Sequence, residues 1–402
     1  MRVALVCLNY PPEPTGIAVY SGGLAEGLAA RDVEVQVVTG LPHYPQWRVY
    51  DGYRPGTLQV SQRLRLTRCR HTVPANPRLV NRLLMELTFG LSASLARWGQ
   101  PDAVVLISPA LFSSLLAALR ATIARRPFLV WIQDIYSLGV SETGRAGKLS
   151  GRCLGLAERL LLRQAAGVLV IHDRFKSYVA RELGIDPARI AVIRNWSHVE
   201  TTTQTDRAAV RARLGWADEV TVVLHAGNMG AKQGLENVVE ASREADAAGR
   251  ELLFVLMGDG NQRAELEANG ENRCLRFVDP LPRDEFLDAL RAADVLLVNE
   301  RAGLTEMAVP SKLTSYFAAG LPVLAATDAT STTAQEVALA GAGLRVDADA
   351  PDQLVAAALR LREDSQLAQT LGASGIAYRQ ASLTEDASLT AFVNQLVDLE
   401  VR

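Results

Sequence analysis

The chain has 402 residues, of which 49% are hydrophobic and 21% charged, a size that predicts two domains of roughly 200 residues rather than one core. This composition excludes a disordered chain, and no run reaches the roughly 18 apolar residues that a membrane-spanning helix needs. The net charge of −2 conceals an asymmetry between the two halves of the chain. Residues 1–200 hold 24 Lys and Arg against 14 Asp and Glu, and residues 201–402 hold 18 against 30. The basic first half favours an anionic partner.

A buried strand is predicted at 3–8, close to the start of the chain. The apolar run is short and leads directly into prolines, so we interpret it as a strand, with a signal peptide as the alternative. The segment 9–29 follows as a proline-containing loop and a helix. Three glycines flank or begin this helix: Gly16, Gly22 and Gly23. They do not form a dinucleotide-binding fingerprint, and Thr39 and Gly40 follow the second strand where an acidic residue would be needed. We therefore expect a lip over a ligand cleft.

Strand–helix alternation is predicted along most of the remaining chain. Short β-branched runs alternate with helical stretches, such as 20–31 and 110–124, that have apolar residues at three-to-four spacing. Runs that are apolar on both faces are typical of a parallel sheet covered by helices. The predicted strands are 3–8, 33–38, 103–107, 128–132, 167–171, 190–193, 220–226, 252–257, 274–278, 294–298, 322–326 and 343–346. The last stretch, 351–400, is predicted to be helical.

Two doubly wound α/β units in tandem follow from this pattern. Polar, Thr-rich residues at 196–206 interrupt the alternation as a linker would, so we place one domain at 1–196 and a second at 207–374. Ligands of such sheets bind outside the carboxyl ends of the strands, and two units that face each other there would form an inter-domain cleft. Several enzyme classes share this architecture, so fold alone does not give the function.

A basic segment between residues 63 and 97 combines arginines with apolar residues. This combination suits a helix that lies on an anionic membrane surface, and a packed helix with a solvated face is the alternative. The residues concerned are Arg63, Arg65, Arg68, Arg70, Arg78, Arg82, Leu79, Leu83, Leu87 and Trp98. Nucleic acid is the weaker interpretation, because no recognition motif is present.

A carboxylate, Asp134, stands just past the predicted strand 128–132. A carboxylate at the carboxyl end of a strand is a candidate for activating an acceptor or for contacting a sugar. A helix cap or an ion pair is the alternative.

The strongest local pattern is LHAGNMGAKQGLE at 224–236, where a strand leads through a glycine-rich loop into a helix that begins near Gly234. Gly227 and Gly230 allow the backbone to approach a ligand closely. The helix start offers free N–H groups, and Lys232 adds a positive charge, which together suit a departing diphosphate. A tight turn with a solvated lysine is the alternative.

Two further segments follow strands of the second unit. MGDGNQ at 257–262 is a weak pattern by itself. In AVPSKLTSYFAAGLPVLA at 308–325, Ser311 opens a helix, Lys312 lies in its first turn and Gly320 ends it. In one interpretation Ser311 simply caps this helix. In the other, Lys312 reaches the same diphosphate as Lys232.

No metal site is predicted. Asp347 and Asp349 form a D-x-D pair, which binds a metal in some transferases, but their place before Pro351 and a helix favours capping. The four cysteines have no CxxC spacing, which argues against zinc and against a disulfide framework and fits reducing cytosol. They are Cys7, Cys69, Cys153 and Cys274.

In the segments around these motifs the sequence resembles the family-4 retaining glycosyltransferases. The resemblance covers most of the chain, and IQD at 132–134 and NWS at 195–197 are similar to the subgroup that acts in colanic-acid, O-antigen and other exopolysaccharide synthesis. It implies a GT-B fold of two facing Rossmann-like domains, with the nucleotide on the second domain and a final segment, 375–402, that crosses back to the first. It also implies retention of configuration, independence of metals, and a nucleotide-diphosphate sugar as donor with no cofactor.

The resemblance also implies roles for individual residues. Lys232 would contact the donor diphosphate, and Asp134 would lie near the transferred sugar. The implied donor-binding residues are Gly16, Gly22, Gly23, Gly227, Asn228, Gly230, Gly258, Asp259, Glu306, Ser311, Lys312 and Ser315.

Two positions depart from the family pattern. Asn228 replaces the usual arginine before the family's lysine. The usual pair of glutamates is missing, since Ser315 or Thr314 stands where the ribose-binding one is expected and Glu306 lies beside Met307 at the other position. The resemblance therefore implies neither the ribose contacts nor the identity of the nucleotide.

We predict a cytoplasmic glycosyltransferase, at the inner face of the cell membrane, that moves a sugar to a saccharide or a polyprenyl-diphosphate-linked acceptor. Three alternatives remain: a soluble natural-product glycosyltransferase, a UDP-sugar 2-epimerase of the same architecture, and an inactive partner subunit. No nucleic acid partner is expected.

Overall fold

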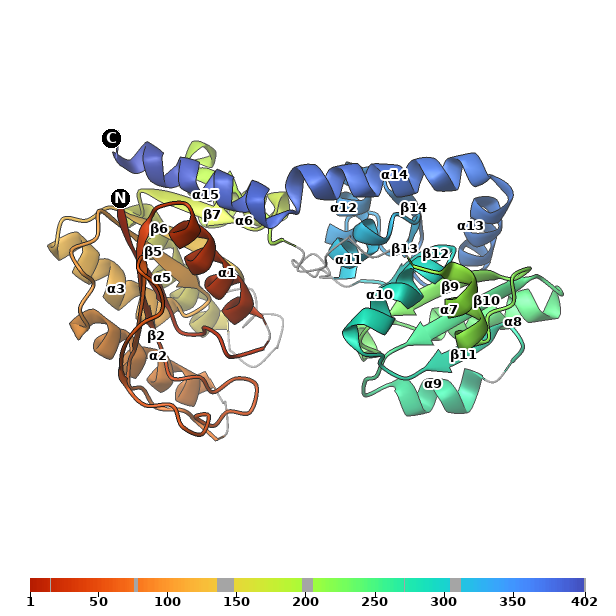
Figure 1. The fold of residues 1–402 in the computed structure, drawn as a ribbon, viewed down its shortest axis with the longest axis horizontal. Coiled ribbons are helices and arrows are strands. Elements are labelled where there is room, and N and C mark those ends of the chain that lie inside the picture. Colours follow the sequence, from red (N-terminus) through yellow and green to blue (C-terminus); the bar gives the residue numbers. More distant parts are fainter. Residues whose placement is uncertain are drawn as a thin grey trace. The chain divides into compact units, whose positions relative to one another are not determined.

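Two α/β units make up the chain (Figure 1). The structure, a computed structural model, describes residues 1–14, 16–75, 79–135, 148–196, 205–270, 272–303 and 312–400. Unit 1 comprises Met1–Asn195 with Glu385–Arg402, and unit 2 comprises Trp196–Thr384. In the described part of the chain, no helix has both the length and the apolar composition required to cross a membrane.

Unit 1 contains an eight-stranded sheet in the order β3-β4-β2-β1-β5-β6-β7-β8. Neighbouring strands are parallel except for the antiparallel pair β3 and β4 at one edge. Its strands are β1 (Arg2–Cys7), β2 (Glu34–Thr39), β3 (Gly56–Gln59), β4 (Leu64–Arg68), β5 (Ala103–Ser108), β6 (Phe128–Ile132), β7 (Gly167–Val170) and β8 (Ile190–Val192). Its helices are α1 (Ile17–Ala30), α2 (Leu79–Leu95), α3 (Leu111–Ile123), α5 (Lys148–Gln164), α6 (Asp173–Arg181), η1 (Pro187–Arg189) and α15 (Glu385–Glu400).

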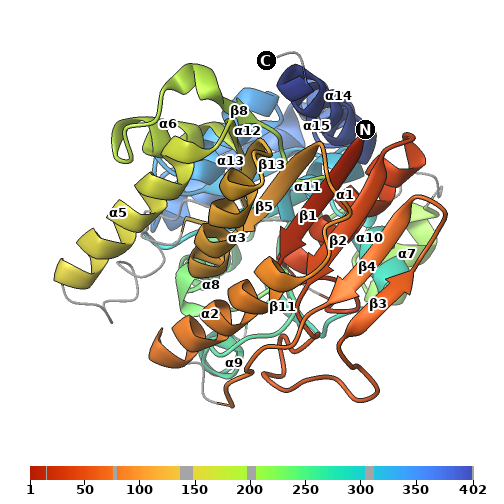
Figure 2. The same cartoon turned by 90° about the vertical axis from the view of Figure 1, so that its left-hand side faces the viewer.

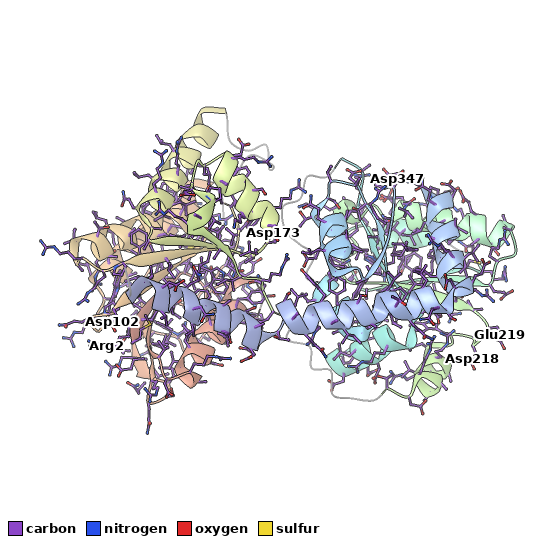
Figure 3. The ribbon with its side chains drawn as sticks, turned by 90° about the horizontal axis from the view of Figure 1, so that it is seen from above. Arg2, Asp102, Asp173, Asp218, Glu219 and Asp347 are labelled. Carbon is purple, nitrogen blue, oxygen red and sulfur yellow. The ribbon has the colours of Figure 1, made fainter. Side chains whose placement is uncertain are left out.

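The two faces of this sheet carry different helices. The chain moves from β1 to β2 in one direction across the sheet, and from β4 through β5 and β6 to β7 in the other. Because such crossovers are right-handed, α1 covers one face and α2, α3 and α5 cover the other. Figure 2 shows these last three helices side by side. At the amino ends of the strands, the backbone N–H of Arg2 donates to the Asp102 carboxylate at 2.7 Å (Figure 3).

The C-terminal helix α15 packs against α1 and the central sheet of unit 1. A Cβ on Gly27 would lie 2.2 Å from Leu389 Cδ1, so the absent side chain lets the two helices approach closely. Phe392 packs edge-on against Trp131 of β6, with their ring centroids 5.2 Å apart. The last helix is therefore part of the core of unit 1.

Unit 2 contains a six-stranded parallel sheet in the order β11-β10-β9-β12-β13-β14. One cluster of buried apolar side chains packs on each face of this sheet. Its strands are β9 (Thr221–Ala226), β10 (Leu252–Met257), β11 (Leu275–Val278), β12 (Val295–Asn299), β13 (Val323–Ala326) and β14 (Gly343–Val346). Its helices are α7 (Arg207–Leu214), η2 (Ala231–Gln233), α8 (Glu236–Ala247), α9 (Arg263–Gly270), α10 (Arg283–Ala292), α11 (Lys312–Ala319), α12 (Thr332–Ala340), α13 (Pro351–Glu363) and α14 (Ser365–Ser382).

The predicted pair of parallel α/β units is confirmed, and every predicted strand overlaps an observed one. The sequence analysis missed β3 and β4, because β3 is fully exposed and β4 alternates buried leucines with arginines at an antiparallel edge. The helix expected near Gly234 begins at Glu236, after the short turn η2. The predicted helical stretch 351–400 consists of α13, α14 and α15, of which only α15 belongs to unit 1.

Candidate active site

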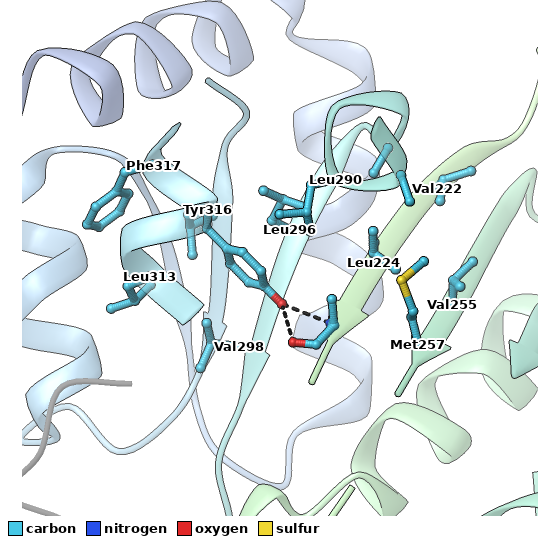
Figure 4. Packing of buried hydrophobic residues seen from close by; sticks show 14 of the residues in the cluster. Val222, Leu224, Val255, Met257, Leu290, Leu296, Val298, Leu313, Tyr316 and Phe317 are labelled. Atoms are coloured by element: carbon cyan, nitrogen blue, oxygen red, sulfur yellow. Dashed lines mark hydrogen bonds between the residues drawn. The ribbon is translucent and has the colours of Figure 1, made fainter. Parts of the chain in front are cut away.

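A topological switch point lies at the carboxyl ends of β9 and β12 in unit 2. The strand order reverses here, because β10 and β11 lie on one side of β9 and β12 to β14 lie on the other. The two strands pair only as far as Leu224 and Leu296. Beyond that point the buried hydroxyl of Tyr316 on α11 (Figure 4) accepts a hydrogen bond from Ala226 N at 2.9 Å. The same hydroxyl lies 3.3 Å from Leu297 O. Ligands of doubly wound sheets bind where neighbouring strands diverge in this way.

The loops that follow β9 and β10 lie backbone to backbone at this edge. Gly227 N donates to Met257 O at 2.8 Å, and Met229 N donates to Asp259 O at 2.8 Å. A Cβ on Gly258 would lie 1.9 Å from Gly227 O. Gly258 therefore has a structural role, since only glycine permits this approach at its φ of +139°.

The loop that carries Lys232 is fixed to the end of β12. Asn299 donates its side-chain amide to the backbone oxygens of Gln233 at 2.8 Å and Gly234 at 2.9 Å. Arg301 N donates to Lys232 O at 3.0 Å. The Lys232 side chain is exposed at this edge. The sequence analysis missed Asn299, although a polar residue that ends the apolar run VLLVN is a signal for this position.

A second lysine, Lys312, approaches the same edge from the start of α11. Its Nζ lies 3.4 Å from Nε2 of His225, a fully buried residue of β9. A Cβ on Gly227 would lie 3.6 Å from this Nζ, so the ammonium group lies over the first residue of the glycine loop. Burial lowers the pKa of Lys312 to about 8, while Glu300 at the end of β12 raises it.

His225 is neutral under ordinary conditions. Burial and, second, the Lys312 charge lower the pKa of its imidazole well below the usual value. A neutral imidazole nitrogen can accept a hydrogen bond from the lysine ammonium. The sequence analysis missed His225, whose signal is one polar residue inside the buried run TVVLHA.

The remaining residues predicted in unit 2 fall into three groups. Asn228 and Gly230 are held by the Gln233 side chain, whose Oε1 accepts from Gly230 N at 3.0 Å and from Asn228 Nδ2 at 3.4 Å. Ser315 lies one turn into α11 and is partly buried. Glu306 and Ser311 lie outside the described residues. Unit 2 thus brings the following predicted residues to one edge: Gly227, Asn228, Gly230, Lys232, Gly258, Asp259 and Lys312.

In unit 1 the predicted glycines occupy α1 and its start. Gly16 is the N-cap of α1 at φ +64°, with open space around the position of a Cβ. Gly22 and Gly23 lie inside the helix rather than in a turn, because α1 already begins at Ile17. A Cβ on Gly22 would lie 2.5 Å from Pro11 Cγ, so this glycine lets the preceding loop pack onto the helix.

Asp134 lies exposed at the carboxyl end of β6. Its Oδ1 accepts from Ile135 N at 2.8 Å, and its backbone oxygen accepts from Ser108 Oγ at 3.1 Å. These bonds hold the carboxylate at the edge of the sheet where the loop before α1 also lies. Its role toward a sugar or an acceptor stays a prediction.

A buried carboxylate that the sequence analysis missed organises this edge of unit 1. Glu13 is 2% exposed, and its Oε1 accepts from the backbone N–H groups of His43 at 2.7 Å and Tyr44 at 2.9 Å. Asn9 donates to the other oxygen at 2.9 Å. Burial and the neighbouring His43 lower the pKa of His71 to about 4. The loops after β1 and β2 are therefore joined by one internal polar cluster.

The described residues contain no group of three or more His, Cys, Asp or Glu arranged to hold a metal ion. The sequence analysis favoured a capping role for Asp347, but this residue does not cap the following helix. Instead it is exposed and pairs with Arg345 at 2.6 Å (Figure 3). This ion pair and a hydrogen bond from Gln353 lower the pKa of Asp347.

The apolar residues named for the basic segment differ in their exposure. Trp98 is 4% exposed, with the Arg120 guanidinium 4.0 Å over its ring, and Leu83 is partly buried. The side chain of Leu79 lies outside the described residues. Leu87 is exposed as expected, and it belongs to a longer apolar stripe on α2.

Comparison with known proteins gives matches along most of the chain. Residues 15–196 match the Glycosyl transferase 4-like domain, and residues 220–364 match Glycosyl transferases group 1. The chain is 33% identical over 339 residues to the proposed colanic acid biosynthesis glycosyl transferase WcaI of Escherichia coli K12, covering 80% of this chain and 82% of that protein.

Solved structures resemble the whole fold. Sucrose-phosphate synthase from Thermosynechococcus elongatus has a TM-score of 0.74 at 19% identity and covers 100% of this chain and 99% of its own. Anabaena HepE, solved in complex with UDP-glucose, has a TM-score of 0.66 at 15% identity and covers 99% and 100%. At these identities the likeness shows the fold alone, and the expected GT-B fold is confirmed.

Proposed function

From the premise that this chain belongs to the family-4 glycosyltransferases of GT-B fold, we propose that it moves a sugar from a nucleotide diphosphate to a saccharide acceptor with retention of configuration. The observation that carries the proposal is the pair of lysines at the β9–β12 switch point. The chain has only four lysines among its 42 basic residues, and two of them, Lys232 and Lys312, flank the end of β12.

Lys312 supplies a positive charge that the protein itself leaves poorly solvated. Its ammonium group lies beside neutral His225 and over Gly227, with Glu300 as the acidic group that acts on it. A diphosphate that enters this edge raises the pKa of Lys312 and gives the buried charge a strong partner. The charge that develops on the leaving diphosphate is then stabilised by a group already in place.

Lys232 contributes from the solvent side of the same edge. Its loop is fixed through Asn299 and Arg301, so the exposed ammonium group needs little backbone rearrangement to meet an oxygen of the donor. The N–H groups of Gly227, Met229 and Gly230 are already bonded within the protein, so in this proposal the glycine loop contributes close backbone approach and the lysines contribute the charge. We assign no metal ion to the reaction, and in this proposal the two lysines neutralise the charge of the diphosphate instead.

The acceptor in this proposal is a lipid-linked saccharide of exopolysaccharide or O-antigen synthesis, met at the cytoplasmic face of a membrane. Two observations support it: the name of the Escherichia coli relative, and the excess of basic residues in the first half of the chain. Asp134, at the carboxyl end of β6, is the group of unit 1 that we assign to the transferred sugar or the acceptor hydroxyl.

A thermal-shift screen with UDP, GDP, dTDP and ADP, each with and without magnesium, tests the donor assignment. We expect one diphosphate to raise Tm selectively and equally in both buffers. Stabilisation that requires magnesium would contradict the metal-free assignment. No stabilisation by any of the four would favour an inactive partner subunit, an alternative supported by Ser315 or Thr314 at the position where the family has a ribose-binding glutamate.

A further inference from the structure

An apolar stripe runs along the exposed side of α2. Five large apolar side chains follow one another at spacings of four, three, four and four residues, with exposed fractions between 36% and 86%. They are Val80, Leu84, Leu87, Leu91 and Leu95. Residues spaced in this way lie on one face of a helix, and this stripe is about 22 Å long at 1.5 Å per residue. The opposite side of α2, with Met85 and Phe89, already packs in the core.

Neighbouring helices widen this apolar surface. α3 exposes Leu119 and Ile123, and α5 exposes Leu156 and Leu160, each more than half exposed. α2 contacts α3, α3 contacts α5, and the three helices cover one face of the unit 1 sheet (Figure 2). We call the nine exposed side chains, with the arginines beside them, the α2–α3–α5 face. Nine exposed apolar side chains on three neighbouring helices differ from single exposed apolar residues, which are ordinary.

The charges around this face are of one sign. The described side chains of α2, α3 and α5 include two carboxylates, Glu86 and Glu158, and each is only 3% exposed. Glu86 faces inward and accepts a hydrogen bond from Phe112 N at 3.0 Å. Arginines in or just after the three helices are at least partly exposed: Arg97, Arg125, Arg126 and Arg163. Arg82 of α2 is not part of this face, because its guanidinium lies 5.8 Å from the centroid of the Trp47 ring.

We propose that the α2–α3–α5 face binds the surface of an anionic membrane. Its leucines would enter the boundary between headgroups and acyl chains, and its arginines would meet lipid phosphates. Charge favours this partner over a second copy of the chain, because a two-fold contact through the same face would set arginines against arginines. The inference extends the proposed function by naming the surface that brings the enzyme to a lipid-linked acceptor, and it does not depend on the donor.

Vesicle flotation of the full chain, without donor or acceptor, tests this face. We expect the protein to float with vesicles of phosphatidylcholine and phosphatidylglycerol, to bind less at high salt, and to stay unbound with phosphatidylcholine alone. The variant Leu84→Glu/Leu91→Glu should bind at least about ten-fold more weakly. Leu339→Glu, at a position of unit 2 that is 60% exposed, should bind like the unmodified protein.

The proposal would be overturned if the protein did not float with anionic vesicles, or if Leu84→Glu/Leu91→Glu floated equally well. It would also be overturned if light scattering showed the unmodified protein to be a dimer and this variant a monomer, with neither form bound to vesicles. Should the variant lose its thermal transition, Arg125→Gln/Arg126→Gln gives the same comparison through charge alone. Vesicle binding with no response to any nucleotide would contradict the proposed donor site and leave this face intact.

Discussion

The helices α2 in unit 1 and α8 in unit 2 have the same structural task, since each covers a parallel sheet, but they present opposite surfaces to solvent. One side of α2 exposes a row of four leucines and a valine, and the other exposed residues among its described side chains are Asn81 and Arg82. The exposed side of α8 carries Glu236, Glu240, Arg243 and Glu244. The core therefore fixes the inward face of both helices, and the outward face is free to take a different function in each unit.

The carboxyl edges of the two sheets differ as well. In unit 2 the edge is built of glycine loops and two lysines, which suits an anionic ligand. In unit 1 the corresponding edge holds the buried carboxylate Glu13 with His43 and His71, and its Arg68 donates to the backbone oxygens of Gly40 at 3.2 Å and Pro11 at 2.6 Å. The same architecture thus supports anion binding in one unit and, in our proposal, acceptor and membrane contact in the other.

The largest expected effect comes from adding a side chain where Gly258 and Gly227 meet in unit 2. Gly258→Ala places a Cβ in the position that lies 1.9 Å from Gly227 O and should destabilise unit 2 by more than about 3 kcal/mol. Gly249→Ala, at φ +61° with open space around it, should cost about 1 kcal/mol. Urea unfolding followed by circular dichroism measures both. Similar stability of the two variants would contradict the structural role of Gly258.

Glu13→Ala makes the matching test in unit 1. It leaves the buried N–H groups of His43 and Tyr44 without their acceptor and should destabilise unit 1 by about 3 kcal/mol. Glu34→Ala removes an exposed carboxylate of β2 and should change the free energy of unfolding by less than about 0.5 kcal/mol. The folded fraction of the Glu13→Ala protein should still bind nucleotide, because the proposed donor site lies in unit 2. Its loss would show that the two edges are not separate in function.

Tyr316→Phe tests the divergence of β9 and β12. Removing the hydroxyl leaves Ala226 N buried without an acceptor, at a cost of about 1–2 kcal/mol, and should weaken nucleotide binding as the crevice relaxes. Tyr50→Phe removes a hydroxyl of unit 1 that donates to Tyr44 O at 2.6 Å in an exposed setting, so it should lower Tm less than Tyr316→Phe and leave binding unchanged. Calorimetric melting and nucleotide titration of both variants provide the measurement. Unchanged binding by a destabilised Tyr316→Phe protein would limit Tyr316 to a packing role.

The smallest expected effect is a pH dependence of donor binding. Lys312 has a pKa of about 8 in the free protein, so it is charged below that pH and neutral above it. Above pH 8 binding of a diphosphate must also bind a proton, and Kd should rise by up to about ten-fold per pH unit. Lys312→Met should bind more weakly at pH 7 and lack this dependence. The same slope in both proteins would assign the titration to another group.

The sequence identified the fold more completely than the site. Apolar runs of β-branched residues predict the strands that are buried on both faces. The exposed edge strand β3 leaves no such pattern, and β4 beside it alternates buried leucines with arginines. The two lysines are visible as local motifs. His225, Asn299 and Glu13 are not, because their importance comes from contacts with residues far away in the chain, such as the 3.4 Å approach of Lys312 to His225.

The most direct test of the account is calorimetric titration of the stabilising nucleoside diphosphate into the unmodified protein, Lys232→Ala/Lys312→Met and the control Lys176→Met. Loss of two charge-assisted contacts should weaken binding by at least about 100-fold in the double variant, with thermal unfolding unchanged and the control unaffected. Equal binding by the double variant and the unmodified protein would contradict the assignment of the donor diphosphate to the β9–β12 edge.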